Sequence, residues 1–424
     1  MEYLANDFVE IVRAPKEKDI HAYTPAICVL ESGRYVFSGD FGGKDVPELP
    51  EYASITPNPS RGITCFGHIY TSDDKGATWQ RRAVRNFTHA RPFASGNTVW
   101  VLGHAGDLVI YRSDDGGETW DEGHFLTEGE SWHQSACGYW VEDGYITLVM
   151  EQTIRIPGEI TSGWPVANLA PVVMRAKLSD DLTKRESWTF SNRVRFRDVV
   201  DEDTLEFHGI PFYTSMKHRD AFTDGRTLTQ MPGWLESNVV RIKDENHYWY
   251  DPTGRTFHIL MRAHTAGSGY CCLMKAVLGE DGGITVMPQE NPSGRKVIFL
   301  PMPGGQMRFH VLWDEKTKLF WLLSTQATDT MTRIDKMGPE RYNIPCDERD
   351  RLQLSFSKNL VDWCFAGMVA HGDSEKQSRH YACMAIDGDD LVITSRTGDK
   401  DTRSAHNTNI SSFHRVKNFR GLVY

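Results

Sequence analysis

A ten-residue phrase that occurs twice in the first third of the chain restricts the possible folds more than any other feature. It reads YTSDDKGATW over 70–79 and YRSDDGGETW over 111–120. Both copies follow the pattern Ser-x-Asp-x-Gly-x-Thr-Trp, and their serines, Ser72 and Ser113, lie 41 residues apart (113 − 72). One copy per unit of this length is typical of a fold made of repeated small sheets.

The residue types in the phrase predict a turn and not a catalytic centre. A carboxylate such as that of Asp74 or Asp115 can accept backbone N–H groups, and the glycine two positions later can take a positive φ. The closing Trp can pack inward against the sheet. Two weaker echoes, LSDDLTKRESW over 178–188 and SFSKNLVDW over 355–363, continue the series further along the chain.

The phrase resembles the Asp-box of sialidase-like β-propellers, which lies between the third and fourth strands of a blade. The resemblance covers most of the chain. Its closing stretch, SRHYACMAIDGDDLVITSRTGD over 378–399 followed by AHNTNISSFHRVKNF over 405–419, is similar to the last blade of bacterial sialidase-like proteins.

Six units of two strand-like runs around a polar turn can be laid out along the sequence. They cover 23–40, 89–106, 133–152, 236–265, 307–328 and 379–399. No amphipathic helix of useful length is found, and the polar segment from about 190 to 232 is interpreted as the outer edge of the third unit plus a long loop. A strand around 7–12 is expected to close the ring by pairing with the last unit. The prediction is an all-β, six-bladed β-propeller with four antiparallel strands per blade, forming a single domain over 1–424.

Propeller geometry then predicts where a site would lie. The inner strand of each blade starts, and the second strand ends, at the face opposite the repeated turns, so these positions converge on one funnel. They are polar in nearly every blade. The catalytic candidates are Glu236, Tyr381, His133, Asp40 and Glu151. The substrate-binding candidates are Arg308, Arg379, Arg396, Arg262, Arg91, His21, Tyr23, His89, His264, His310, His380 and Gln306.

The funnel is rich in arginine and histidine although the chain carries a formal net charge of −10. Local positive charge of this kind favours an anionic ligand, because a guanidinium matches a carboxylate with two hydrogen bonds. Carboxylates in the same funnel can supply a general acid or base. Nearby tryptophans (Trp132, Trp164 and Trp234) suit the C–H faces of sugar rings. An acidic oligosaccharide is therefore the expected partner.

The resemblance adds expected roles. Sialidases use three arginines to hold the substrate carboxylate, a tyrosine nucleophile assisted by a glutamate, and an aspartate as acid and base. It implies Tyr381 as the tyrosine and an arginine cluster drawn from Arg308, Arg379, Arg396 and Arg262. Tyr23, two residues before a proline, stands where the first of those arginines normally stands, which favours an acidic sugar other than sialic acid.

Three functions remain open from the sequence. The favoured one is an exo-acting glycoside hydrolase of an acidic glycan, such as a sialoside or a uronate-containing oligosaccharide. The second is a lyase that removes the C5 proton of a uronate, with a histidine or tyrosine as base. The third is a propeller that binds glycan or protein without turnover.

Composition and motifs argue against several other classes. The acidic balance, with an isoelectric point near 5.9, does not suit nucleic acid or an anionic membrane. No metal-binding pair, phosphate-binding loop or dinucleotide fingerprint is present, so no cofactor is expected. The eight cysteines form no CxxC pair, and the sequence shows neither a secretory signal nor a run of eighteen apolar residues. A cytoplasmic protein is expected, and the sequence does not set its oligomeric state.

Overall fold

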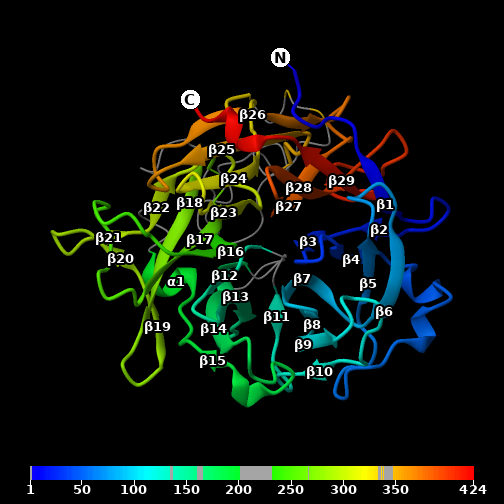
Figure 1. Ribbon diagram of the computed structural model, residues 1–424, viewed down its shortest axis with the longest axis horizontal. Coiled ribbons are helices and arrows are strands. Elements are labelled where there is room, and N and C mark those ends of the chain that lie inside the picture. Colours follow the sequence, from blue (N-terminus) through cyan, green and yellow to red (C-terminus); the bar gives the residue numbers. More distant parts are fainter. Residues whose placement is uncertain are drawn as a thin grey trace.

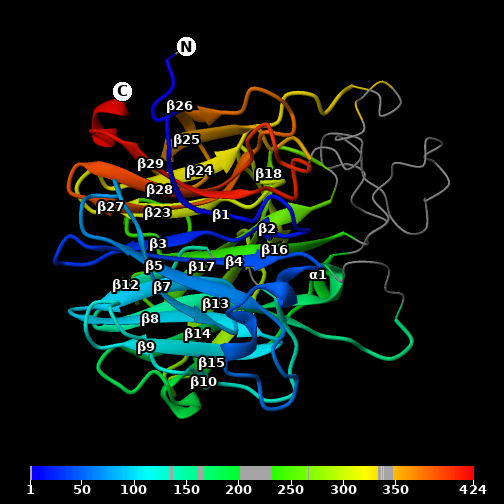
Figure 2. The ribbon, with the colours of Figure 1, turned by 90° about the vertical axis from the view of Figure 1, so that its right-hand side faces the viewer.

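The structure is a computed structural model that describes residues 2–133, 137–159, 166–200, 232–265, 267–332, 336, 338 and 347–424. Six antiparallel sheets are arranged around a central axis, which Figure 1 views nearly end-on and Figure 2 from the side. This confirms the predicted six-bladed propeller. The expected long loop is only partly described, because 201–231 lie outside the described residues.

Blades 1 to 3 follow each other along the first half of the chain, each running outward from its inner strand. Blade 1 contains β2 (His21–Ala22) and β3 (Ala26–Val29), which share the inner position, then β4 (Tyr35–Gly42), β5 (Phe66–Ser72) and β6 (Gln80–Arg85). Blade 2 contains β7 (Thr88–Ser95), β8 (Thr98–Ala105), β9 (Asp107–Ser113) and β10 (His124–Phe125). Blade 3 contains β11 (Trp132–His133), β12 (Trp140–Glu142), β13 (Tyr145–Thr153), β14 (Leu169–Lys177) and β15 (Thr189–Phe190).

Blades 4 to 6 complete the ring. Blade 4 contains β16 (Gly233–Val240), β17 (Thr256–His264), β18 (Tyr270–Leu278) and β19 (Ile284–Met287), with β22 (Phe299–Pro301) also paired to β18. A separate hairpin joins β20 (Gln289–Glu290) to β21 (Lys296–Val297). Blade 5 contains β23 (His310–Asp314), β24 (Leu319–Thr325), β25 (Arg351–Ser357) and β26 (Cys364–His371). Blade 6 contains β27 (Arg379–Asp387), β28 (Asp390–Thr397), β29 (Ile410–Val416) and β1 (Val9–Arg13).

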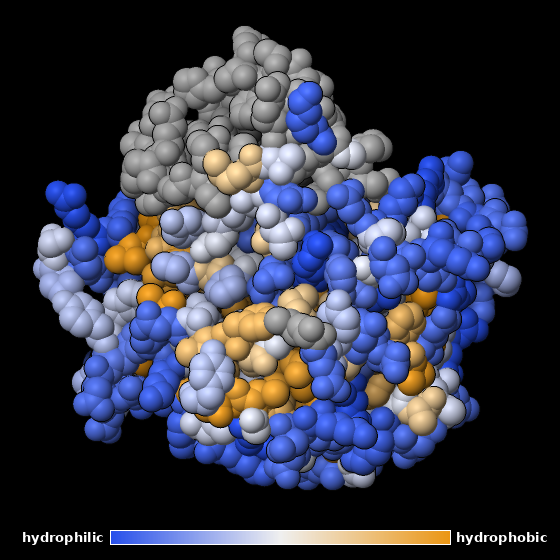
Figure 3. Space-filling model, turned by 90° about the horizontal axis from the view of Figure 1, so that it is seen from above, coloured by the Kyte–Doolittle hydropathy of each residue, from blue (hydrophilic) through white to orange (hydrophobic). Residues whose placement is uncertain are grey.

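The first and last strands of the chain meet in blade 6. β1 pairs antiparallel with β29, with Val9 opposite Phe413 and Arg13 opposite Ile410. The outer edge of blade 5 is covered by both chain ends, since Leu4 N donates to Met368 O and Tyr424 OH to Phe365 O. Figure 3 shows an apolar strip within a hydrophilic surface on this side. Pairing and covering of this kind remove exposed sheet edges.

The core lies between neighbouring blades, where apolar faces of adjacent sheets interlock. One cluster joins Trp100 of blade 2 to Leu148 and Met174 of blade 3, and another joins Trp321 of blade 5 to Ile393 of blade 6. In the described residues the helices are one four-residue α-helix and a few short 3-10 turns. They are α1 (Phe196–Val199) and the turns Val46–Glu48, Tyr52–Ser54, Val166–Asn168, Arg185–Ser187 and Phe419–Leu422. None of the described helices is long and apolar enough to cross a membrane.

The two repeated turns, 72–79 and 113–120, have the same hydrogen bonds and lie between the third and fourth strands of blades 1 and 2. In the second turn, Asp115 accepts from Ser113 Oγ (2.8 Å), Thr119 N (2.9 Å) and Thr119 Oγ1 (2.6 Å). Gly117 (φ 91°) donates its N–H to Ser113 Oγ, and its carbonyl accepts from Trp120 Nε1. The structural interpretation of the phrase is therefore confirmed.

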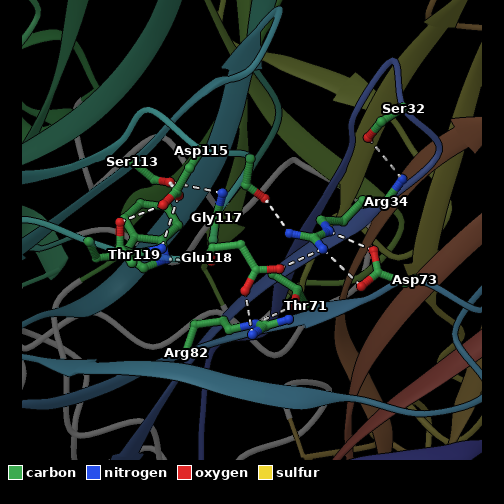
Figure 4. Close-up of polar contacts among 12 residues, drawn as sticks. Ser32, Arg34, Thr71, Asp73, Arg82, Ser113, Asp115, Gly117, Glu118 and Thr119 are labelled. Atoms are coloured by element: carbon green, nitrogen blue, oxygen red, sulfur yellow. Dashed lines mark hydrogen bonds and ion pairs between the residues drawn. The ribbon is translucent and has the colours of Figure 1, made fainter.

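Arg34, in the turn that leads into β4, bridges the two repeated turns (Figure 4). Its guanidinium donates to Asp73 of the first turn (2.6 and 2.9 Å) and forms an ion pair with Glu118 of the second (2.6 Å). Arg82 holds the other oxygen of Glu118 (2.5 Å). The turns thus join blades 1 and 2 at one face and leave the other face to the candidate site.

Candidate active site

Three inner strands carry the same distortion near their starts. In β7, β16 and β27 one extra residue interrupts the pairing with the second strand, and the bulge contains His89, Glu236 and Tyr381 respectively. Each of these three residues has a positive φ: 52°, 61° and 50°. The other five described non-glycine residues with positive φ lie in turns or bends. A left-handed non-glycine residue within a strand costs about 1–3 kcal/mol, and such strain gathers at functional sites.

Tyr381 and Glu236 come together from blades 6 and 4. The Tyr381 hydroxyl donates to Glu236 Oε1 (2.5 Å), and Arg262 Nη1 donates to both Glu236 oxygens (3.3 Å) and to the Tyr381 oxygen (3.1 Å). Burial raises the pKa of Tyr381 to about 12, and the Glu236 charge adds to this effect. The phenol is therefore protonated at neutral pH, with a carboxylate in place to accept its proton and a guanidinium beside both.

Three further arginines surround this pair. Arg396 lies with its Cζ 4.0 Å from the centre of the Tyr23 ring and 5.2 Å from that of Tyr381, and Arg308 lies 5.9 Å from the Tyr381 ring. Arg349 forms an ion pair with Asp347 (3.2 Å) and contacts His380 Nδ1 (3.4 Å).

Two of these arginines, Arg396 and Arg308, form no ion pair with a described carboxylate. Arg396 Nη2 donates to the carbonyl of His406, and Arg308 Nη1 donates to Ala382 O at 2.7 Å. Among the described residues, no carboxylate lies within 4.0 Å of Arg396 or Arg308. Burial lowers the pKa of Arg396 to about 10, which still leaves it charged at neutral pH. A buried charge without a counter-ion is costly, so this arrangement suits an anionic ligand.

A histidine cluster forms the side of the site contributed by blades 2 and 3. His89 Nδ1 lies 3.0 Å from His104 Nε2, and the His89 and His133 ring centres are 4.7 Å apart. Burial lowers the pKa of His104 to about 3 and that of His133 to about 4. These rings are neutral at neutral pH, so they offer hydrogen bonds to hydroxyl groups and no charge.

Asp40 and Glu151 end the second strands of blades 1 and 3, and each contacts the bulged strand of the next blade. Glu151 Oε1 accepts from Ser237 N (2.9 Å) and Ser237 Oγ (2.7 Å), directly after Glu236. Asp40 Oδ2 accepts from Thr88 Oγ1 (2.7 Å), directly before His89. Burial raises the pKa of Asp40 to about 6 and that of Glu151 to about 7. Both carboxyls therefore titrate closer to neutrality than ordinary ones.

Comparisons with known proteins agree with this architecture. No protein-family model matches the chain, and no functionally curated sequence is significantly similar to it. A Trypanosoma rangeli sialidase solved with sialic acid matches 98% of this chain and 59% of its own, at a TM-score of 0.54 and 12% identity. A Dyadobacter fermentans protein of unknown function matches 97% of this chain and 99% of its own (TM-score 0.52, 12% identity). A Penicillium chrysogenum α-L-arabinanase solved with arabinobiose matches 99% of both chains (TM-score 0.49, 12% identity).

The chain has the sialidase-like six-bladed propeller fold. Within this sialidase-like propeller, blade 1 borders the arginine cluster. Tyr23 OH donates to Asn407 (2.9 Å), and its ring contacts those of His21 and His406. His21 Nε2 lies 2.8 Å from Asp19 Oδ1. Tyr23 thus stacks on Arg396 at the start of the first blade.

The structure places several predicted binding residues elsewhere in the sialidase-like propeller. Arg91 and His310 line a separate cavity further along the axis. Arg91 donates to Gly138 O (3.1 Å) and Val149 O (2.7 Å), which ties blade 2 to blade 3. Arg91 follows the β7 bulge, and side chains beyond a bulge face a different part of the axis. His310 is the first residue of β23, whose pairing with β24 is regular, so its position has another cause. Their expected place beside Tyr381 is corrected accordingly.

Arg379 also departs from its expected position. Its Nη1 donates to Gly398 O (2.7 Å) and Ser378 O (2.9 Å), and its Cζ lies 5.2 Å from the Phe8 ring. It precedes the Tyr381 bulge by two residues and caps loop carbonyls beside the N-terminal segment. These contacts hold Arg379 against loop carbonyls, and its assignment to the substrate stays a prediction.

Gln306, His264 and His380 support the site from behind. The Gln306 carbonyl accepts from Arg262 Nε (2.9 Å), which fixes that guanidinium beside Glu236. His264 is 2% exposed, and burial followed by the Arg262 charge lowers its pKa to about 3. His380 is fully buried with its ring centre 5.1 Å from that of Tyr381. Trp164, one of the tryptophans predicted to suit a sugar ring, lies outside the described residues.

Sequence reasoning missed Arg349. It precedes β25, the third strand of blade 5, whereas the predicted site residues lie on inner and second strands. The signal was present, because the run CDERDR over 346–351 places two arginines among four acidic or polar residues just before an apolar strand. Within the described ranges, no three His, Cys, Asp or Glu side chains are arranged to hold a metal ion.

Proposed function

We propose that this protein is an exo-acting glycoside hydrolase that uses Tyr381 as nucleophile and acts on a glycan with a terminal acidic sugar. The observation that carries the proposal is the Tyr381–Glu236–Arg262 contact. Two residues held in strained left-handed bulges, 145 positions apart in the sequence, share a short hydrogen bond. Strain of this kind, in a buried and polar site, supports a chemical role.

In the proposed first step, the Tyr381 oxygen attacks the anomeric carbon and its proton passes to Glu236. The bond from the anomeric carbon to the leaving oxygen breaks, and a covalent aryl glycoside of Tyr381 forms. Arg262 Nη1, 3.1 Å from the Tyr381 oxygen, stabilises the charge that develops there. In the second step water attacks the same carbon and the bond to the Tyr381 oxygen breaks. Tyr381 takes its proton back from Glu236, and the water gives its proton to the carboxylate that protonated the leaving oxygen.

The leaving oxygen needs a proton, and we assign this to Asp40. Its pKa is raised to about 6, so about a tenth of the molecules carry this proton at pH 7, far more than for an ordinary aspartate. One oxygen is held by Thr88, while Oδ1 is buried and has no hydrogen-bond partner among the described residues. An orphaned carboxyl oxygen of this kind suits a group that exchanges a proton with substrate.

The proposal that the substrate sugar is acidic rests on Arg396. This guanidinium is 3% exposed, lies between the Tyr23 and Tyr381 rings, and has Nε without a partner among the described residues. A substrate carboxylate would supply the missing counter-charge. The neutral histidine cluster would contact the sugar hydroxyls on the opposite side.

The test of the nucleophile is covalent trapping. A fluorinated glycosyl fluoride of an acidic sugar should slow the second step and leave the sugar attached to the protein. Mass spectrometry of a digest should find it on Tyr381, and not in Tyr381→Phe. Attachment to Glu236 or Asp40 would overturn the assignment of the nucleophile.

The substrate class is tested with matched fluorogenic glycosides. We expect turnover of a sialoside, glucuronide or galacturonide and much slower turnover of neutral pyranosides and arabinofuranosides. Arg396→Met should raise KM for the acidic substrate about tenfold or more, as expected for a lost charge-assisted contact. Faster turnover of neutral glycosides would overturn the acidic substrate while leaving Tyr381 intact. Products that absorb in the near ultraviolet, as unsaturated uronates do, would indicate a lyase instead.

A further inference from the structure

A second cavity lies on the propeller axis, lined by residues of the inner strands. All six blades contribute, through β3, β7, β12, β16, β23 and β27. Its volume is about 350 Å³, within the range of small-molecule sites. Glu236, Tyr381, Arg262 and Arg396 are not among its lining residues. The cavity is therefore distinct from the candidate active site.

Most of the cavity wall is apolar. Ile27, Val240, Val311 and Ile386 line its length, and Trp140 and Trp313 line it near Val141, which is 48% exposed and marks the mouth. Lys243 and Glu315 also line the cavity, and they neutralise each other in an ion pair of 2.5 Å. An apolar body, including a flat ring, matches this wall.

The inner end of the cavity is positive. Arg91 is 1% exposed, uses both Nη atoms on carbonyls, and has no hydrogen-bond partner for Nε among the described groups. No described carboxylate lies within 4.0 Å of it. Arg308 lies behind, next to the cavity-lining thiol of Cys137, and burial raises the pKa of that thiol to about 12. The thiol is neutral, so it does not balance the two guanidinium charges.

His310 adds a hydrogen-bond donor to the same end. Met384 N donates to His310 Nδ1 (3.0 Å), so the ring proton is on Nε2. Nε2 lies beside Gly138, where a Cβ would come within 3.0 Å of it. The glycine thus keeps this donor clear. A buried guanidinium without a counter-ion within 4.0 Å among the described residues and a neutral imidazole N–H therefore lie at the same end of the cavity.

We propose that this axial cavity is a second binding site, for a small carboxylic acid with an apolar or aromatic body. The carboxylate would lie against Arg91 and His310, and the body would occupy the apolar length toward Trp140 and Trp313. The positive end selects the anion because an uncompensated buried charge is stabilised by an opposite one. This site does not depend on the proposed hydrolase activity.

Benzoate and benzyl alcohol are suitable probes, because they share a ring and differ in charge at neutral pH. Titration calorimetry should show benzoate binding about tenfold or more tightly than benzyl alcohol, the difference that one charge-assisted contact provides. Ala385→Phe, which fills the cavity from β27, should abolish benzoate binding. Arg91→Gln should weaken it at least tenfold. The control Arg255→Gln, which removes an exposed charge, should leave it unchanged.

The active-site arginines could also attract benzoate, and two measurements separate the sites. Arg396→Met should leave benzoate affinity unchanged if the axial cavity is occupied. Anomalous scattering from 4-iodobenzoate in crystals of the unaltered protein should place the iodine between Trp140 and Trp313. Equal affinity for benzoate and benzyl alcohol, unchanged binding in a folded Ala385→Phe variant, or iodine beside Tyr381 would each overturn the proposal.

Discussion

At the scale of single residues, the proposed activity rests on the hydrogen bond between Tyr381 and Glu236. Tyr381→Phe removes only the hydroxyl, and Glu236→Gln keeps the shape of the acceptor while removing its basicity. Each should lower kcat by about 10²–10⁴, with a small effect on KM, because the contact acts on the reacting bond. Steady-state kinetics on an acidic aryl glycoside measures this. A loss confined to KM would contradict the assigned roles.

The role of Asp40 can be separated from that of the nucleophile by the choice of leaving group. An aryl leaving group of low pKa needs no proton, whereas an alkyl or sugar leaving group does. Asp40→Asn should therefore retain most activity on a nitrophenyl glycoside and lose about 10²-fold or more on a natural disaccharide. Equal losses on both substrates would show that Asp40 only supports Thr88 and the neighbouring bulge.

The raised pKa of Glu151 predicts that the free energy of unfolding depends on pH. Its pKa rises from 4.5 to about 7 on folding because of burial, so the folded protein holds this proton more tightly than the unfolded chain. The resulting stabilisation is present below pH 4.5 and is lost as the pH rises through 7. Glu151→Gln should remove this slope, on the order of 3 kcal/mol across the window. Urea denaturation below and above it measures the change, and a slope equal to that of the unaltered protein would contradict the prediction.

At the scale of elements, the repeated turns should contribute stability and no chemistry. Asp115→Ala removes three hydrogen bonds at an exposed turn, so we expect a loss of about 1 kcal/mol of unfolding free energy and unchanged kcat. The pKa of Asp115 is lowered to about 2 by those bonds, so its contribution should be present above pH 3.8 and vanish as the pH falls through 2. Reduced turnover at full stability would contradict this interpretation.

The elements also show how far the sequence predicts the site. The alternation of apolar and polar residues, together with the turn residues, predicts where the strands start and end. Glu236, Tyr381 and Arg396 are predicted as site residues on this basis. The bulges could not be predicted from the sequence, because their left-handed positions are occupied by Glu, His and Tyr and not by the glycine that usually indicates a positive φ. One extra residue changes which side chains face the axis beyond it, which is why Arg91, just after the β7 bulge, lines the axial cavity instead. The repeated turn sequence predicts the blades well because each turn is formed by residues close together in the sequence. A shift in strand register depends on how a strand pairs with its neighbour, so the sequence of one strand does not predict it.

At the scale of the whole molecule, we propose that the six blades form one cooperative domain closed by β1. Calorimetry should show a single unfolding transition, and deletion of residues 2–13 should lower its midpoint, since β29 then loses its partner along Val9–Arg13. Two separated transitions would show that the ring consists of independently stable parts. Retention of the unaltered midpoint after the deletion would show that β1 does not close it.

The three bulges occupy alternate blades, 2, 4 and 6, and so stand about a third of a turn apart around the axis. The backbone device is the same in each, yet the side chains are an imidazole, a carboxylate and a phenol. Because the left-handed strain is carried by the main chain, one backbone device presents three different polar groups. Replacing Tyr381 or His89 by another non-glycine side chain should therefore leave the ring intact and change only the group presented at that point.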